Sequence, residues 1–296
     1  MTAAEHPVGR IIASYGKRGI LADEDGARYR YVLKGRRLRV VCGDYVSWDP
    51  ATRGEEARVT GVHDRRNALE RPDSRGKTEL IAANLTRIVV VIAPAPAPDF
   101  FLVDRYICAA EMQGIAAAIA WNKADISNSL PEELEDYAKL GYPILPVSAT
   151  TGTGIAALAQ LLRDGVSLLA GQSGVGKSSL INALVPQADV TVGSLSEANR
   201  EGRHTTTASF MHTLPGGGEL IDTPGVREFA PVIHDLGKVQ NGFREILALA
   251  GDCRFGDCQH MREPDCAVKQ ACEGGRIPAR RYASYKRLRN SAAALQ

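Results

Sequence analysis

The strongest chemical pattern in the chain is a glycine-rich stretch that ends in a lysine and two serines. It reads Gly171, Gln172, Ser173, Gly174, Val175, Gly176, Lys177, Ser178 and Ser179, and it matches the phosphate loop Gly-x-x-x-x-Gly-Lys-Ser/Thr. Its glycines let backbone N–H groups converge on an anion, and the helix that follows adds its positive dipole end. Lys177 would reach the β- and γ-phosphates of a nucleotide, and Ser178 would ligate Mg²⁺. A chance glycine-rich turn is disfavoured, because an apolar strand pattern precedes the stretch and a helical one follows it.

A second pattern, upstream of the first, has side chains that can recognise a guanine base. The Asp125 carboxylate can accept hydrogen bonds from the N1–H and the exocyclic amine of guanine, a donor pair that adenine lacks. The Lys123 stem would lie over the base plane, and the backbone at 148–149 would contact the guanine carbonyl. The predicted base site comprises Asn122, Lys123, Ala124, Asp125, Ser148 and Ala149.

Downstream of the phosphate loop, Asp222 ends a strand pattern and is followed by Thr-Pro-Gly225. Asp222 can hold Mg²⁺, and the Gly225 N–H can sense a γ-phosphate. Many GTP-hydrolysing proteins place a water-orienting glutamine directly after this glycine, but here Val226 stands there and cannot orient water. We therefore predict a nucleotide-dependent switch that takes its catalytic side chain from elsewhere.

The candidate source of that side chain is the stretch Gly202-Arg-His204-Thr-Thr206-Thr, between the phosphate loop and Asp222. One of its threonines, for which we take Thr206, would complete the Mg²⁺ shell with Ser178 and Asp222. His204 would position water, and the alternative is that it is an exposed loop histidine. Slow intrinsic turnover is expected.

Four of the six cysteines crowd into one short C-terminal stretch together with a histidine. In a reducing compartment this crowding favours a metal site over disulfides. Three thiolates and one imidazole make a closed tetrahedral zinc site, whose role would be in folding. The predicted ligands are Cys253, Cys258, His260 and Cys266, and the alternatives are buried free thiols or Cys272 in place of His260.

The elements that must position these groups change in type along the chain. Residues 1–72 contain short alternating apolar and polar runs at 9–14, 28–33, 38–41, 44–48 and 57–62, separated by turn residues. Five such strands are typical of an OB-type barrel. Residues 71–77 are polar and lack periodicity, which indicates a linker.

Over residues 73–230 strands alternate with helices. The apolar run 87–93 is typical of a strand covered on both faces in a parallel sheet, and further strands are predicted at 117–121, 144–147 and 166–170. Helices are predicted at 102–113, 132–140, 155–163 and 177–184. We therefore predict a multi-domain fold: an all-β OB-type barrel, a doubly wound α/β P-loop domain, and an α-helical zinc domain over 231–296.

The net charge is only +2, but basic residues gather in two groups, one near each end of the chain. Cations interleaved with aromatic residues on a barrel favour RNA binding, and solvated charge is the alternative. The first group is Lys17, Arg18, Arg28, Arg30, Lys34, Arg36, Arg37 and Arg39 with Tyr29 and Tyr31; the second is Arg276, Arg280, Arg281, Lys286, Arg287 and Arg289. No apolar run reaches membrane-spanning length and the N-terminus lacks a secretory pattern, so we expect a cytoplasmic protein.

The order of these motifs is unusual, because the base-reading motifs precede the phosphate loop. The motifs resemble the signatures of the translation-factor-like P-loop superfamily, in which the phosphate loop comes first. Joining the ends of such a fold and cutting it elsewhere changes the connectivity but keeps the site. One consequence is that the chain after Asp222 leads straight to the C-terminal region, so we expect that region to respond to the nucleotide at Gly225.

Together the features resemble the RsgA-type family of ribosome small subunit-dependent GTPases. The resemblance rests on the OB-type region, the permuted core, the Gly-Arg-His-Thr-Thr-Thr loop, the stretch from Asp222 to Phe229 and the Cys-Cys-His-Cys cluster. It implies a monomeric GTP-hydrolysing enzyme with Mg²⁺ and one structural Zn²⁺ that cycles between GTP and GDP. Its implied partner is the 30S subunit with its 16S rRNA, which would stimulate it and whose late maturation it would assist.

Two other classes of function stay open. One is a GTP-dependent switch with a different RNA or protein partner. The other is an RNA-binding module with a vestigial nucleotide site, against which the intact Lys177, Ser178 and Asp222 argue.

Overall fold

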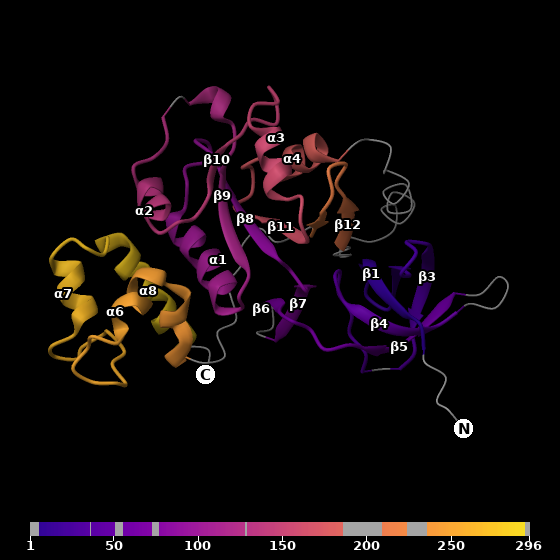
Figure 1. Cartoon of the computed structure of the whole chain (residues 1–296), viewed down its shortest axis with the longest axis horizontal. Coiled ribbons are helices and arrows are strands. Elements are labelled where there is room, and N and C mark those ends of the chain that lie inside the picture. Colours follow the sequence, from indigo (N-terminus) through magenta and orange to yellow (C-terminus); the bar gives the residue numbers. More distant parts are fainter. Residues whose placement is uncertain are drawn as a thin grey trace.

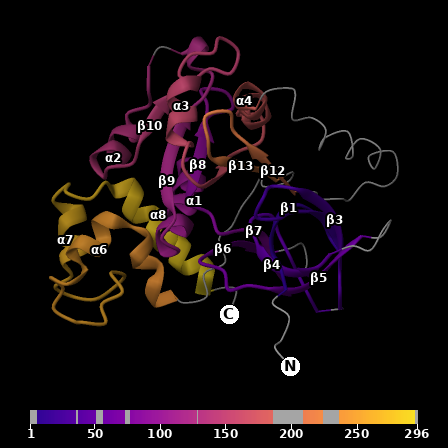
Figure 2. The ribbon, with the colours of Figure 1, turned by 45° about the vertical axis from the view of Figure 1, so that its right-hand side comes forward.

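The structure, a computed structural model, describes residues 6–35, 37–50, 56–72, 77–127, 129–185, 209–223 and 236–293. Three parts follow one another across the molecule (Figure 1). A strand barrel and a group of C-terminal helices lie on opposite sides of a central layer of strands and helices. The same arrangement is visible in the turned view of Figure 2.

The N-terminal part is a closed five-stranded barrel, which confirms the predicted OB-type fold. Its strands are β1 (Val8–Tyr15), β2 (Arg18–Ala22), β3 (Arg28–Leu33), β4 (Tyr45–Asp49) and β5 (Ala57–Val62). They pair in the order β1-β2-β3-β5-β4, and β4 closes the barrel by pairing with β1. Ile11, Leu21, Tyr31 and Val59 fill its interior and are fully buried.

One of the five predicted barrel strands was wrong. The structure has a strand at Arg18–Ala22 that the pattern did not indicate, and residues 38–41 form none. Backbone groups of residues 38–41 form hydrogen bonds with side chains instead of with a neighbouring strand. The Asp44 carboxylate accepts from the Val41 N–H at 2.9 Å, and the Ser14 hydroxyl donates to the Val40 carbonyl at 3.2 Å. Such bonds compete with strand pairing.

The central part is the predicted doubly wound sheet. Its strands β8 (Arg87–Ile92), β9 (Ala116–Trp121), β10 (Ile144–Pro146), β11 (Val166–Ala170) and β13 (Glu219–Asp222) run parallel in the order β10-β9-β8-β11-β13. Strand β12 (Ser209–Thr213) pairs antiparallel with β13. Its helices are α1 (Phe100–Met112), α2 (Glu133–Lys139), α3 (Ile155–Leu161) and α4 (Lys177–Leu184).

Strand β8 shows why its sequence is apolar from Ile88 to Ile92. Ile88, Val90 and Ile92 belong to the same buried cluster as residues of α1, whereas Val89 and Val91 belong to the cluster that contains residues of α3 and α4. Successive side chains of a strand point to opposite faces, so a strand covered on both sides buries every residue.

The barrel and the central sheet are joined by strand pairing that the sequence did not indicate. Strand β12 pairs antiparallel with β1, with Ala13 opposite Phe210, so eleven of the described strands form one continuous sheet. Arg10 of β1 is also paired with Glu219 of β13. A separate hairpin of β6 (Ala68–Pro72) and β7 (Thr78–Ala83) follows the barrel, so Arg71 and Pro72 lie in a strand and not in the predicted linker.

The C-terminal part consists of the 3-10 helix η3 (Leu236–Gly242) and the helices α6 (Arg244–Ala250), α7 (Ala267–Glu273) and α8 (Ala279–Ala293). Together with Cys108 of α1 they enclose an apolar cluster in which Val239, Phe243 and Ile277 are buried. Beside this cluster, charged side chains of α8 meet the buried Asp104 of α1.

Four arginines among the six residues of the predicted C-terminal basic group make contacts within the protein. Arg281 is fully buried between Asp104 and Glu245, and the Arg280 guanidinium also contacts Asp104, at 3.0 Å. The Arg289 guanidinium donates to the Gln259 carbonyl, and the Arg287 guanidinium lies over the Phe101 ring. These four cations are therefore engaged in packing within the protein.

Candidate nucleotide site and metal cluster

The phosphate loop connects β11 to the start of α4, the connection that a phosphate-binding loop requires. At two positions of this loop a side chain would collide with neighbouring atoms, so glycine is required there. Gly171 has φ +140°, and a Cβ there would lie 2.1 Å from the Val91 carbonyl oxygen; Gly176 has φ +91°, and a Cβ there would lie 2.4 Å from the Asn122 amide nitrogen. Gly174 is also in the left-handed region, and Ser178 and Ser179 are exposed on the first turn of α4.

The base-reading motif follows β9 at the same edge of the sheet, and Asn122 ties it to the phosphate loop. Asn122 is 1% exposed, and its side-chain nitrogen donates to the Val175 carbonyl at 2.8 Å. Its side-chain oxygen accepts from the Ala149 N–H at 3.4 Å. Asn122 thus braces three loops, and the structure gives it this positioning role.

Lys123 has a left-handed backbone, with φ +59°, and its side chain turns back over the phosphate loop. The ammonium donates to the Gly174 carbonyl at 2.8 Å and to the Ala95 carbonyl at 2.6 Å. Ala95 belongs to the proline-rich loop after β8. The repeated prolines of that loop indicate stiffness, but its contact with Lys123 has no signal in the sequence.

The remaining base-site residues lie beside these. Asp125 is exposed in the short 3-10 helix η1 (Ala124–Ile126), where a base can reach its carboxylate. The Ala124 N–H donates to the Val147 carbonyl at 3.1 Å, which holds this helix against the turn that carries Ser148 and Ala149. Ser148 is buried and its hydroxyl accepts from the Thr151 N–H, so it shapes that turn. The predicted base site is therefore assembled in one place.

Asp222 is the last residue of β13, which runs parallel to β11 with Ile221 opposite Leu168. This register puts Asp222 at the carboxyl edge of the sheet, next to the strand that leads into the phosphate loop. Lys177 donates to the Gly171 carbonyl at 2.8 Å and to that of Gln172. His204, Thr206, Gly225 and Val226 lie outside the described residues.

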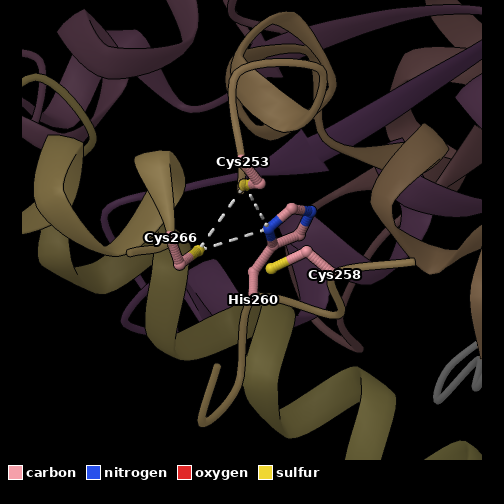
Figure 3. A group of neighbouring side chains, drawn as sticks. All are labelled: Cys253, Cys258, His260 and Cys266. Atoms are coloured by element: carbon pink, nitrogen blue, oxygen red, sulfur yellow. Dashed lines mark hydrogen bonds between the residues drawn. The ribbon is translucent and has the colours of Figure 1, made fainter. Parts of the chain in front are cut away.

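In the C-terminal part the four predicted metal ligands converge (Figure 3). The ligand atoms of Cys253, Cys258, His260 and Cys266 lie within 4.8 Å of one another. The Cys253 and Cys266 sulfurs are 3.8 Å apart, and the His260 Nδ1 lies 3.5 Å and 3.4 Å from them. Tetrahedral zinc with bonds of about 2.3 Å to sulfur and about 2.0 Å to nitrogen separates these pairs by about 3.8 Å and about 3.5 Å.

The donor set therefore fits zinc, and Cys272 is not part of the cluster. Burial lowers the pKa of His260, which favours the neutral imidazole that binds metals. Burial also raises the pKa of the Cys258 thiol to about 12, so a bound cation is what would hold it as a thiolate.

The loop that carries His260 is organised by Glu263. Burial opposes ionisation of this carboxylate, but backbone N–H donors around it hold its pKa at about 2. The N–H groups of Gln259, Met261 and Arg262 donate to it at 2.8–3.0 Å. This clamp surrounds His260, whose backbone has φ +57°. No sequence pattern singled out Glu263.

A model of the family described as RsgA GTPase matches residues 62–231, more than half of the chain. The chain belongs to the RsgA GTPase family. It is 44% identical over 289 residues, 95% of this chain and 84% of the relative, to the small ribosomal subunit biogenesis GTPase RsgA of Ectopseudomonas mendocina. It is likewise 44% identical over 285 residues, with the same coverage, to that of Pseudomonas aeruginosa strain LESB58.

Solved structures agree with this assignment. YjeQ from Thermotoga maritima superposes with a TM-score of 0.74 at 28% identity, covering 97% of this chain and 99% of that one. YloQ, described as a circularly permuted GTPase, superposes with a TM-score of 0.73 at 24% identity, covering 100% of this chain and 98% of that one. This likeness shows the fold. As a member of the RsgA GTPase family the chain is a GTP-hydrolysing enzyme.

Among the described residues, no helix has the length and apolar character needed to cross a bilayer.

Proposed function

We propose that this chain hydrolyses GTP while bound to the small ribosomal subunit, whose late maturation it assists by releasing assembly factors. The observation that carries the proposal is the brace made by Asn122, which holds the Asp125 loop and the phosphate loop as one site. The relatives at 44% identity are named for small ribosomal subunit biogenesis.

Within this site we propose that GTP is bound by the residues predicted from the sequence. The guanine would meet Asp125, the Lys123 stem and the backbone at Ala149, while residues 171–179 hold the phosphates and Gly225 senses the last of them. Ser178, Asp222 and Thr206 would hold Mg²⁺, and His204 would position water. The support is the shared carboxyl edge of the sheet, where α/β proteins bind ligands.

We further propose that the C-terminal cluster holds one structural Zn²⁺, as its ligand spacing supports. The protein would act as a cytoplasmic monomer. Its proposed division is a barrel over 1–72, a permuted GTPase domain over 73–230 and a zinc domain over 231–296. The barrel has an apolar cluster of its own, which supports this division, whereas the C-terminal cluster also includes Cys108 of α1.

The barrel is the proposed contact with 16S rRNA. Arg28 and Arg30 are exposed on one face of β3, with Lys17 exposed in the turn before β2. The tyrosines between them are less available: Tyr31 is fully buried and Tyr29 packs against Trp48, with ring centroids 4.8 Å apart. Recognition here would therefore rest on charge, which gives a strong dependence on salt.

The experiment is binding to purified small and large subunits over a range of salt concentration. Replacing Arg28 and Arg30 by alanine is expected to weaken small-subunit binding and to reduce the slope of log affinity against log salt by about 2, one unit for each lost phosphate contact. Matched charge removal at the exposed Lys139 and Arg163, in the central part, should leave the slope unchanged. Equal slopes for both double variants would refute the barrel contact.

A further inference from the structure

The short helix η3 begins the described C-terminal part and is packed against α1. A Cβ at Gly242 would lie 2.2 Å from the Cys108 sulfur, so η3 and α1 touch at a residue that has no side chain. Val239 and Phe243, on either side, are fully buried in the C-terminal cluster. The backbone of η3 is therefore fixed between the GTPase part and the metal cluster.

One side chain of this fixed helix reaches a metal ligand. The Gln240 side-chain oxygen lies 2.9 Å from the His260 Nε2, and the His260 Nδ1 faces the sulfurs of Cys253 and Cys266. A carbonyl oxygen is an acceptor, so this contact requires the proton to lie on Nε2. The lone pair of Nδ1 is then directed at the thiols, where a metal would bind.

Further hydrogen bonds hold the backbone at and around His260. Tyr282 donates its hydroxyl to the His260 carbonyl at 2.6 Å, and the Glu263 clamp holds the N–H groups of the neighbouring residues. These bonds place the loop, and the buried ring packs near Tyr285, but none of these contacts selects which ring nitrogen carries the proton. Gln240 fixes the ring itself. A ligand histidine commonly donates its other N–H to an oxygen, and removal of that oxygen weakens metal binding.

We propose that Gln240 is the positioning residue of the zinc site, selecting the Nδ1-ligating form of His260. The inference rests on the proposed zinc site and deepens it. His260, the fourth ligand, is oriented by η3, which lies in the chain between the nucleotide switch and the zinc site. Zinc retention therefore depends on the docking of η3 against α1.

The test compares Gln240→Leu, which removes the acceptor, with Gln240→Glu, which keeps one, in the full chain. Gln270→Leu, at an exposed position of α7, is the matched control. Zn²⁺ affinity is measured by competition with a chromophoric chelator, and Co²⁺ absorption reports ligand geometry. We expect Gln240→Leu to lose about 10- to 100-fold in Zn²⁺ affinity, and Gln240→Glu and Gln270→Leu to stay near the parent protein.

A readout in the parent protein does not depend on how any variant folds. The ¹⁵N–¹H spectrum of the zinc-loaded parent should show metal on Nδ1 of His260 and a proton on Nε2; metal on Nε2 would overturn the inference. Unchanged affinity in Gln240→Leu, or equal losses in Gln240→Leu and Gln240→Glu, would also overturn it. If the parent binds neither Zn²⁺ nor Co²⁺ tetrahedrally, the proposed zinc site itself fails, which is a distinguishable result.

Discussion

Replacing Asp125 by asparagine is expected to turn the guanine site into one that prefers xanthine. The carboxylate accepts from both the N1–H and the exocyclic amine of guanine, whereas an amide offers one acceptor and one donor. The amide oxygen keeps the bond to N1–H, but the bond to the exocyclic amine, worth about 1.5–3 kcal/mol with a charged acceptor, is lost, which lowers GTP affinity by about 10- to 100-fold. Xanthine carries a carbonyl in place of the amine, so the new amide N–H pairs with it.

Equilibrium binding of GTP and xanthosine triphosphate to the parent protein and to Asp125→Asn measures this exchange. Asp164→Asn is the control, because Asp164 is exposed next to the start of β11, at the opposite edge of the sheet from the phosphate loop. The parent and the control should both prefer GTP. A variant at Asp125 that still prefers GTP to the same degree would remove this residue from the base site.

Replacing Asp104 by alanine is expected to release the C-terminal helices from the GTPase part. Asp104 is fully buried and accepts from Arg281 at 2.6 Å, from Arg280 at 3.0 Å and from the Tyr137 hydroxyl at 2.6 Å. Burial acts to lower the pKa of Arg281, but Asp104 and Glu245 raise it above its usual value. Removing one member of a buried ion pair costs about 3–5 kcal/mol, because the other charge stays in the interior.

Amide hydrogen exchange along α8 measures the effect, since it reports the free energy of local opening. The control is Asp136→Ala, because Asp136 is partly exposed and lies 3.7 Å from Arg280. An exposed ion pair contributes about 0–1 kcal/mol to stability, so hydrogen exchange in α8 should barely change in Asp136→Ala. Equal exchange in the two variants would mean that the buried charges do not hold α8 to α1.

Much of the central fold could be predicted because its signals are local. Strand β8 is apolar from Ile88 to Ile92, and the phosphate loop lies between a strand and a helix, so both are recognisable within a few residues. Motifs at the ends of parallel strands meet at one edge whatever the order of the strands in the chain. The amino-acid sequence alone therefore suffices to place the base site beside the phosphate loop.

What could not be predicted depends on partners distant in the chain. The direction in which Arg281 points is decided by Asp104, 177 residues away, so a buried ion pair has the sequence pattern of a basic surface. The pairing of β12 with β1 also has no local signal, because an edge strand looks the same with or without a neighbour. Gln240 acquires its role when η3 docks beside His260.

The central claim is that GTP hydrolysis by this permuted site depends on the small ribosomal subunit. The most direct measurement is the steady-state hydrolysis rate of the chain alone, with purified small subunits, and with large subunits, using Lys177→Ala as the inactive reference. We expect the chain alone to hydrolyse GTP slowly, and small subunits to raise the hydrolysis rate at least about tenfold. A tenfold rise corresponds to an activation free energy lower by about 1.4 kcal/mol. A rate unchanged by small subunits, or raised equally by large subunits, would contradict the account.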